Sequence, residues 1–228
     1  MPELFPAAKC RRKMKASPED NSGLRTFLTN PTVYVFFQRL LGGKGVGAFL
    51  ANDFWKLKGG ETVVDIGCAS GFVLDYMPND VRYYGVDISK EYIDAAQKKF
   101  SARGRFLLGT AQDLLNNGGD ALLKKVDLVT CNGLLHHLTD DEASEILEIS
   151  KQFLRPGGRL VCLEATFLTR QTRLSKQMVN MDRGRYVRSE QQWKDLIARS
   201  FDTFSTSVVT GLIRIPYTHI VIQCVNEQ

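Results

Sequence analysis

An acidic residue and two glycines lie close together in the segment E-T-V-V-D-I-G-C-A-S-G-F, residues 61–72. Asp65 stands near the end of a short apolar run, and Gly67 and Gly71 follow it. Glycine adopts backbone conformations that other residues avoid and lets a ligand approach the main chain, while a carboxylate accepts several hydrogen bonds. In an open α/β sheet, ligands bind where such a turn follows the carboxyl end of a strand. The spacing therefore predicts a turn that holds a small molecule.

Two common nucleotide-binding motifs are not satisfied by the glycines of this chain. A dinucleotide fingerprint, G-x-G-x-x-G, would need glycine where the chain has Ala69 and Phe72, and Phe72 would block the close approach of helix to strand. The cluster G-G-K-G-V-G at 42–47 has glycine after its lysine, where a phosphate loop has Ser or Thr. We interpret this second cluster as a helix C-cap and a mobile connector.

The segments around the turn alternate between strand and helix patterns. Apolar residues at helical spacing predict helices over 90–100, with Ser89 as the N-cap, and over 140–154, with acids in the first turn. Alternation of strands with such helices predicts parallel β-α-β units. The strands are predicted from short apolar runs at 62–66, 82–87, 105–109, 126–131 and 159–165.

The last part of the chain breaks this alternation. A helix is expected over 191–199, followed by strands at 204–210 and 219–225. The connection between these two strands is too short for a crossover helix, so they should pair antiparallel. The expected fold is therefore α/β and Rossmann-like, a seven-stranded, mostly parallel sheet with the last strand antiparallel and helices on both faces.

The order of these motifs resembles that of the class I S-adenosylmethionine-dependent methyltransferases. Asp65, Gly67 and Gly71 match the family's first motif, with Ala69 where the family often has glycine. Asp87, at the end of the second strand, matches the acid that binds both ribose hydroxyls in that family. Three further family motifs follow in the same order, at 112–114, 126–138 and 154–161, the last with Pro156-Gly157 placed for a tight turn.

The resemblance implies the methyl donor S-adenosyl-L-methionine, with S-adenosyl-L-homocysteine as its product. Three histidines and no paired cysteines predict that the chain holds no metal ion. It places the amino-acid end of the donor at the first turn, where the N-terminus of the following helix favours a carboxylate. The residues that we expect at the cofactor are Asp65, Gly67, Cys68, Ala69, Gly71, Asp87, Ile88, Gln112, Asp113, Asn132, Gly133 and Leu134.

Two histidines follow the fourth strand, where the family's acceptor pocket opens. Methyl transfer depends mainly on alignment, and a general base is needed only when the acceptor arrives protonated. His136 and His137 are the candidate bases, and His137 is the one that we expect to face the substrate. The alternative for this pair is that one histidine is a packed structural residue.

The segment 166–188 is expected to form a basic lid over the acceptor. It contains six Arg or Lys residues and one acid, Asp182. Arginine suits carboxylate and phosphate groups, so we expect a small acidic or phosphate-bearing substrate, with a solvated basic loop as the alternative. Asn132-Gly133-Leu134 differs from the N-P-P-Y pattern of adenine-N6 enzymes. The residues expected at the substrate are Tyr34, Glu164, Arg183, Tyr186 and Arg188.

The composition is that of a globular protein with a mild basic bias, a formal net charge of +5. This bias permits an anionic substrate without demanding nucleic acid, so an RNA methyltransferase and a silent cofactor-binding scaffold remain the alternative functions. Five cysteines without a C-x-x-C pair predict free thiols and a cytoplasmic protein, and no run is long enough for a membrane span. The expected organisation is a flexible basic segment at 1–19, a helical cap at 20–58 and the methyltransferase domain at 59–228.

Overall fold

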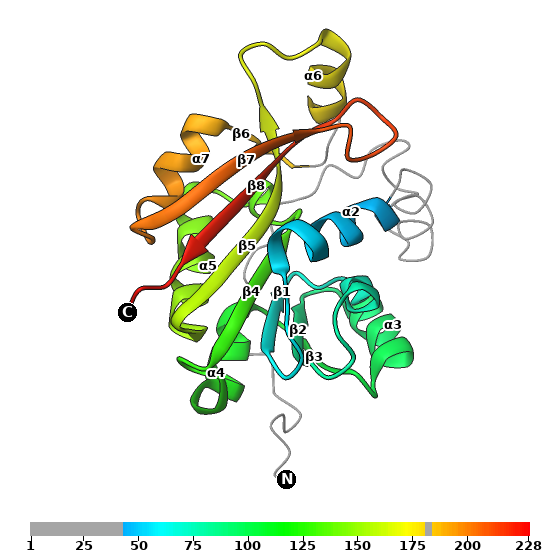
Figure 1. Cartoon of the computed structure of the whole chain (residues 1–228), viewed down its shortest axis with the longest axis vertical. Coiled ribbons are helices and arrows are strands. Elements are labelled where there is room, and N and C mark those ends of the chain that lie inside the picture. Colours follow the sequence, from blue (N-terminus) through cyan, green and yellow to red (C-terminus); the bar gives the residue numbers. More distant parts are fainter. Residues whose placement is uncertain (1–42, 181–183) are drawn as a thin grey trace.

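The computed structural model describes residues 43–180 and 184–228. Within them, one mixed sheet has eight strands, of which seven follow the order β3-β2-β1-β4-β5-β8-β7 (Figure 1). The predicted strands are all present, most with nearly the predicted bounds. They are β1 (Thr62–Ile66), β2 (Arg82–Asp87), β3 (Gly104–Leu108), β4 (Val126–Asn132), β5 (Leu154–Phe167), β7 (Thr203–Thr210) and β8 (Thr218–Val225).

The direction of the strands confirms the predicted topology. Strands β1 to β5 pair parallel with their neighbours, and β8 pairs antiparallel with both β5 and β7. The two-residue strand β6 (Arg188–Ser189), which the sequence did not predict, adds to the edge of β5 beyond this order. The expected turn at Pro156-Gly157 lies inside β5 as an irregularity: the paired residues of β5 jump from Leu154 to Arg159, while their partners in β4 advance only from Val126 to Leu128.

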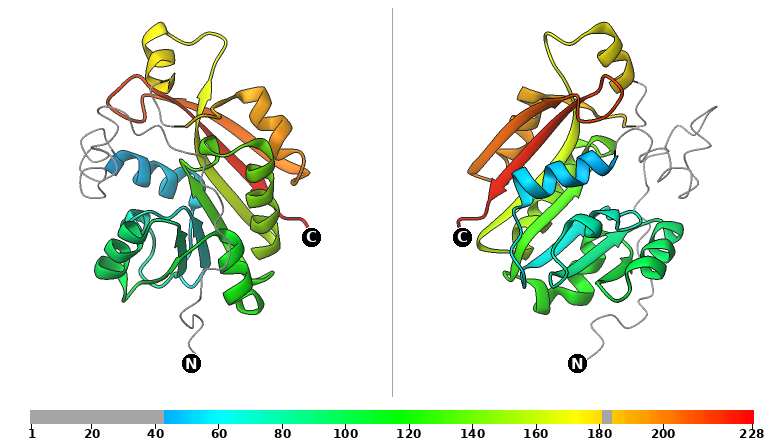
Figure 2. Two further views of the ribbon diagram at one scale, coloured as in Figure 1. Left: turned by 180° about the vertical axis from the view of Figure 1, so that it is seen from behind. Right: turned by 45° about the vertical axis from the view of Figure 1, so that its right-hand side comes forward.

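Helices cover both faces of the sheet, as predicted. On one face, α4 (Ala111–Leu122), α5 (Asp140–Phe153) and α7 (Glu190–Ile197) pack against the larger apolar core. On the other face, α2 (Gly43–Phe49), the π-helix η2 (Leu50–Trp55), the 3-10 helix η3 (Phe72–Tyr76) and α3 (Lys90–Phe100) enclose a second core. Figure 1 shows α2 crossing in front of the strands and α5 behind them, and the view from behind in Figure 2 reverses this order.

Local sequence explains where the two predicted helices begin. The Ser89 side chain accepts a hydrogen bond from the Tyr92 amide at 3.3 Å, which confirms it as the N-cap of α3. Helix α5 begins with a capping box, in which the side chains of Thr139 and Glu142 each bind the other's backbone amide. These caps fix the helix starts, and the buried apolar stripes then decide which way each helix faces the sheet.

Our interpretation of the glycine cluster at 42–47 as a helix C-cap and mobile connector is wrong. Its residues from Gly43 onward form α2, which continues directly into η2. A side chain at Gly47 would overlap the ring of Tyr76, so this glycine allows the helix to pack closely on η3. The helix ends at Lys56, which has a left-handed backbone with φ 43°. Close packing, rather than mobility, accounts for glycine in this helix.

The N-terminal predictions fall largely outside the described residues. The basic segment 1–19, the apolar helix expected near Pro31 and the candidate substrate residue Tyr34 all lie there. Only the end of the predicted cap is described, as α2 and η2. The described cysteines, Cys68, Cys131, Cys162 and Cys224, are free and buried. No helix in the described ranges combines the length and apolar character that crossing a membrane requires.

Candidate cofactor and acceptor site

The sheet brings the predicted site residues together at one edge, where the parallel strands end. The turn after β1 is tied to β2 by hydrogen bonds from the Gly67 and Cys68 amides to the Val86 carbonyl, at 2.9 and 3.1 Å. The segment after β4 is tied to β5 by a bond of 2.8 Å from the Gly133 amide to the Leu163 carbonyl. These bonds hold separate sequence motifs in one place.

The first turn needs the glycines that the sequence supplies. Gly67 and Gly71 have φ values of 74° and 69°, in the left-handed region. A Cβ atom at Gly71 would lie 2.9 Å from the Phe106 ring, so both conformation and space exclude a side chain there. Ala69 also has a positive φ, 46°, which is strained for alanine. Ala69, which stands where the family often has glycine, therefore still adopts a left-handed backbone conformation.

The element after this turn differs from the expected helix. Residues 72–76 form one short 3-10 helix, η3, with Gly71 as its N-cap. The amides of Gly71 and Leu74 are already bonded within this region, to the carbonyls of Cys68 and Gly71. The turn is therefore followed by a short 3-10 helix, and the expectation that the following helix N-terminus favours the donor's carboxylate stays a prediction.

The Asp87 carboxylate ties the turn after β1 to the start of α3. Its Oδ2 accepts a hydrogen bond from the Ala69 amide and its Oδ1 accepts one from the Ser89 amide, both at 2.9 Å. A carboxylate oxygen can accept a further hydrogen bond, so two hydroxyl groups can be added to this arrangement. Ile88, the next residue, has 64% of its surface exposed. The apolar side chain of Ile88 is thus exposed to solvent next to the Asp87 carboxylate, which two backbone amides fix in place.

Asp65 is buried behind the turn rather than open to a ligand. Its Oδ2 accepts a hydrogen bond of 2.5 Å from the hydroxyl of Tyr83, which is also buried. Burial raises the pKa of Asp65 to about 7, although the Tyr83 hydrogen bond lowers it, and the nearby Asp87 raises it further. The Cys68 side chain is buried there as well, and burial raises its thiol pKa well above the ordinary value. Cys68 therefore supports the turn and does not present its side chain to a ligand.

The segment after β3 is held by its own acid. Asp113 Oδ2 accepts hydrogen bonds from the Thr110 amide and hydroxyl at 2.9 and 2.8 Å. Gln112 is half-buried, and its side-chain amide donates to Asn116. Both predicted residues lie at the start of α4, after β3 has ended, which is the same edge as Asp87.

Glu164, in β5, anchors the segment that follows β4. Its Oε1 accepts hydrogen bonds from the Leu134 and Leu135 amides at 3.2 and 3.0 Å. Its Oε2 accepts from the His136 amide at 3.3 Å and lies 2.5 Å from His136 Nδ1. Glu164 is fully buried, so it positions residues 134–136 instead of contacting the substrate as the sequence predicted.

The remaining residues of this segment are also held by the sheet. Asn132 donates to the Thr130 hydroxyl at 2.8 Å and accepts from the Leu163 amide at 3.2 Å. Gly133 has a left-handed φ of 67°, and Leu134 packs next to Gly67. His136 is buried and His137 is half-buried, with their ring centroids 4.3 Å apart. Leu134 is therefore the residue of this segment that contacts the first turn.

Arg188 is a structural residue, which corrects its assignment to the substrate. It is buried, and its guanidinium donates to Asp140 Oδ1 and to the carbonyls of Leu135, Leu138 and Tyr186, at 2.9 to 3.0 Å. It also stacks over the Trp193 ring at 4.8 Å. No pattern of residues indicates this role, because a basic residue in a basic segment is ordinarily exposed.

The other cations of the predicted lid are exposed around α6 (Arg173–Asn180), which projects beyond the end of β5 (Figure 1). Tyr186 is exposed at 36%, and its amide donates to the His136 carbonyl at 3.0 Å. Arg183 lies outside the described residues. The exposed cations are Arg170, Arg173, Lys176 and Arg185.

Comparison with known proteins identifies the family. Residues 64–160 match the model of a methyltransferase domain. The chain contains a class I S-adenosylmethionine-dependent methyltransferase domain. A ubiquinone biosynthesis O-methyltransferase of Actinobacillus pleuropneumoniae is 29% identical over 105 residues, which are 44% of this chain and 44% of that protein. The match thus spans less than half of the relative's length.

Solved structures of methyltransferases share the fold. A Haemonchus contortus phosphoethanolamine N-methyltransferase, in complex with phosphomonomethylethanolamine and S-adenosylhomocysteine, has a TM-score of 0.66 and 14% identity, and covers 90% of this chain and 59% of that one. A geranyl diphosphate methyltransferase with GPP and sinefungin has a TM-score of 0.62 and 13% identity, covering 80% and 77%. Because the sequence identity is this low, the similarity concerns only the fold.

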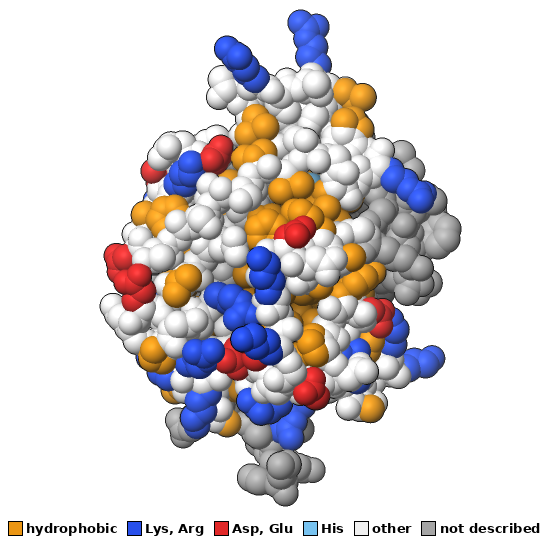
Figure 3. Space-filling model, in the orientation of Figure 1, with side chains coloured by type: hydrophobic (Ala, Val, Ile, Leu, Met, Phe, Trp, Pro, Cys, Tyr) orange, Lys and Arg blue, Asp and Glu red, His pale blue; other side chains and the backbone are white. Residues whose placement is uncertain are grey.

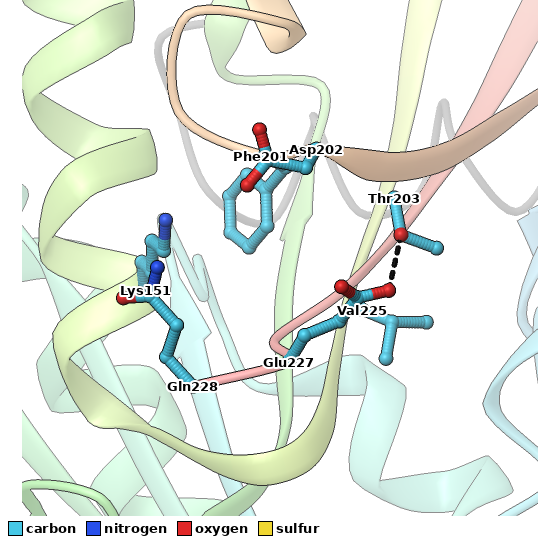
Figure 4. A pocket seen from close by; sticks show the side chains of 7 residues that line it. All are labelled: Lys151, Phe201, Asp202, Thr203, Val225, Glu227 and Gln228. Atoms are coloured by element: carbon cyan, nitrogen blue, oxygen red, sulfur yellow. Dashed lines mark hydrogen bonds between the residues drawn. The ribbon is translucent and has the colours of Figure 1, made fainter.

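The site of the methyltransferase domain is distinct from the cavity drawn in Figure 4. That cavity lies at the opposite edge of the sheet, beside the beginning of β7 and the end of β8. Its lining includes Lys151, Phe201 and Glu227, and Glu227 accepts a hydrogen bond from Thr203. Across the described residues, no group of three or more His, Cys, Asp or Glu side chains is arranged to hold a metal ion.

Proposed function

We propose that this chain transfers a methyl group from S-adenosylmethionine to a small anionic or amphipathic molecule. The observation that carries the proposal is the held carboxylate of Asp87 next to the left-handed turn of Gly67, Ala69 and Gly71, in a matched methyltransferase domain. A turn without bulky side chains admits the donor close to the main chain, and Asp87 suits its ribose hydroxyls.

The residues of the site fit S-adenosylmethionine. Exposed Ile88 offers an apolar surface to the adenine ring, and Gln112 or Asp113 offers polar groups to its amino group. Asp65 shapes the turn from behind. When bound, S-adenosylmethionine supplies a methyl group on a sulfonium, whose sulfur leaves with the electron pair of the broken bond. The protein then has to align the acceptor and, for a protonated acceptor, remove its proton.

The acceptor side of the site combines cations with apolar side chains. An apolar cluster beneath α6 consists of Ala165, Val179 and Tyr217 with half-buried neighbours that include Phe167 and Met178. Figure 3 shows cations projecting at the end of the molecule that carries α6, and hydrophobic side chains gathered between this end and α2. This combination favours a molecule with an apolar body and an acidic or phosphate group.

The names of some similar proteins motivate the same substrate class, while the structural neighbours share only the fold with this chain. The two structural neighbours are named for phosphate-bearing molecules, phosphoethanolamine and geranyl diphosphate. The curated relative is named for O-methylation in ubiquinone biosynthesis. We propose a histidine of the pair at 136–137 as the base for a protonated acceptor.

Titration calorimetry of the full chain with S-adenosylmethionine and S-adenosylhomocysteine tests the proposed cofactor. We expect both to bind, and failure of both would overturn the methyltransferase proposal. Labelled S-adenosylmethionine, incubated with the protein and a metabolite extract, then tests the acceptor by mass analysis of the labelled product. A product without an acidic or phosphate group, or labelling confined to RNA, would overturn the proposed substrate class.

Charge reversal at α6 tests the role of the basic segment. The double variant R173E/K176E should raise the KM for the identified acceptor at least tenfold and leave cofactor affinity unchanged, because both side chains are exposed and lie away from β1 and β2. The matched control is R105E, in the edge strand β3, which is also exposed. An unchanged KM in the double variant would indicate that the cations of α6 form only a solvated face.

A further inference from the structure

The two edge strands of the sheet differ in how they are protected. Strand β3, at one edge, has five residues and carries the exposed Arg105. Strand β7, at the other edge, has eight residues, T-F-S-T-S-V-V-T, without a charge, a proline or a glycine. We infer that β7 pairs antiparallel with β7 of a second copy of this chain, around a two-fold axis. This inference does not depend on the proposed methyl transfer.

The outer side of β7 is a regular strand edge. Among the described residues its strand neighbour is β8, on one side only (Figure 1). The register with β8 runs unbroken from the pair Thr203–Val225 to the pair Thr210–Thr218, so no bulge turns the edge away. Proteins ordinarily protect such a row of backbone N–H and C=O groups with charges, a proline or a bulge. The absence of all three from β7 favours its being covered by another strand.

The residues of β7 match those of a second β7 in one register. Residues directly opposite each other in an antiparallel pair have the same hydrogen-bonding type, so both numbers are even or both are odd. The register centred on Thr206 places Thr206 opposite itself and Phe204 opposite Val208 of the second copy. Aromatic–β-branched and Thr–Thr pairs are cross-strand pairs that stabilise sheets. Registers centred one residue to either side pair Phe204 with a threonine instead.

Helix α7 places charges of both signs beside the proposed axis. The Thr206 hydroxyl donates to Glu190 Oε1 at 3.4 Å, so Glu190 lies over the centre of β7. Glu190 also pairs with Lys194, one helical turn later, at 2.7 Å, and both side chains are partly exposed. A two-fold axis perpendicular to the sheet keeps α7 of both copies on the same face, so each Glu190 faces the side that carries Lys194 of the other copy. The charges at this edge are therefore complementary to their own copy.

The opposite face of β7 offers small side chains to a second copy. Ser205 and Ser207 are exposed on this face, and Val209 packs against the core on the α2 side of the sheet. The cofactor turn and the segment after β4 are separated from β7 by β5 and β8 in the strand order. Pairing at β7 therefore leaves the candidate site of each copy uncovered, and we expect cofactor affinity to be independent of it.

Sedimentation velocity of the full chain at micromolar concentration measures the assembly. The wild type should sediment with the mass of two chains. In S205K/S207K each new lysine lies directly opposite a lysine of the second copy, and like charges in such pairs are destabilising, so this variant should sediment as a single chain. The matched control, S101K/A102K, adds the same charge at exposed positions after α3 and should keep the mass of two chains. Circular dichroism verifies that both variants are folded.

Cysteine cross-linking tests the register of the proposed pair. The four described cysteines are buried, and Cys10, outside the described residues, is replaced in a C10S background. Residues 206 of the two copies should lie about 5 Å apart, and residues 208 roughly 14 Å apart. Oxidised glutathione should therefore link C10S/T206C into a two-chain band on a non-reducing gel and leave C10S/V208C as single chains.

Three results would each overturn the inference. They are a single-chain mass of the wild type at every concentration up to its solubility limit, a two-chain mass that persists in S205K/S207K, and equal cross-linking of T206C and V208C. The proposed function is tested separately, because failure to bind S-adenosylhomocysteine would overturn the methyltransferase proposal and leave the pairing of β7 unaffected.

Discussion

The hydroxyl of Tyr83 in β2 donates a hydrogen bond of 2.5 Å to the Asp65 carboxylate in the neighbouring strand β1, and both side chains are buried. Asp65 is the acidic residue of the motif that suggested the cofactor, yet its side chain is hydrogen-bonded to a residue of the neighbouring strand. The bond connects the start of the cofactor turn to the strand that ends in Asp87, so the two halves of the cofactor site are joined through buried polar groups.

Tyr83→Phe should destabilise the fold by about 1–3 kcal/mol, because it removes the donor and leaves a buried carboxylate without this partner. Chemical denaturation of the wild type and the variant measures the change. The double variant Y83F/D65N provides the control, since the loss caused by Y83F should shrink when Asp65 is no longer a carboxylate. Equal losses in both backgrounds would show that the hydroxyl does not act through Asp65.

The raised pKa of Asp65 predicts how stability depends on pH. The pKa of Asp65 is about 7 in the folded protein, against 3.8 for an ordinary aspartate, so between these values the folded state holds a proton that the unfolded state has lost. The contribution of Asp65 is therefore full below about pH 4 and is lost as the pH rises through 7, by about 1.4 kcal/mol per pH unit. Denaturation at several pH values should show a shallower fall for D65N. An identical slope in D65N would contradict the assignment.

Ala69→Gly should stabilise the protein by roughly 1 kcal/mol, because Ala69 holds a left-handed backbone that glycine adopts without strain. Gly71→Ala provides the opposite case, since its Cβ would lie 2.9 Å from the Phe106 ring and the variant should lose stability and cofactor affinity. Thermal unfolding and calorimetry with S-adenosylhomocysteine check both. Destabilisation by A69G would show that the alanine methyl group makes a compensating contact.

Asp87→Asn should weaken S-adenosylhomocysteine binding at least tenfold, because the side-chain amide nitrogen cannot accept the hydrogen bonds that both carboxylate oxygens now accept. The matched control is D75N, whose carboxylate is exposed and pairs only with Lys99 among the contacts described. Calorimetry should detect no change for D75N. Equal affinities for D87N and the wild type would remove Asp87 from the cofactor site.

Arg188→Lys should cost about 2–4 kcal/mol of stability, since lysine cannot donate at once to Asp140 and to the three carbonyls that Arg188 binds. R173K, on the exposed surface of α6, should change stability by less than about 0.5 kcal/mol. Denaturant unfolding compares the two. If R188K were as stable as the wild type but failed to bind an anionic acceptor, the original assignment of Arg188 to the substrate would return.

Much of the fold was predictable because it follows from local patterns. The apolar runs of β1, β2 and β4 specify buried strands, and Ser89 caps the helix that the spacing indicates. Two elements of the fold were not predicted correctly, each for a physical reason. The glycine cluster of α2 looked like a helix end, but a helix accepts glycine where a neighbour such as Tyr76 packs closely against it. The two-residue strand β6 carries no periodic pattern at all.

Burial of polar groups was the hardest feature to predict for the site. Asp65 was expected at the cofactor, but it is buried and bonded to Tyr83, a partner that the register of β1 and β2 brings beside it. Nothing in the order of residues pairs Glu164 with His136, or Arg188 with the carbonyls after β4. These contacts join positions that are distant in sequence.

The sequence by itself determined the fold class, the edge of the sheet that holds the site and the cofactor motif around Asp65, Gly67, Gly71 and Asp87. These features depend on periodicity and on residue types that act within a few positions of one another. Only the tertiary structure decided that Glu164, His136 and Arg188 are buried and which groups they contact. These contacts follow from burial and from hydrogen bonds between distant segments, because a buried charge must find its partners wherever the fold places them.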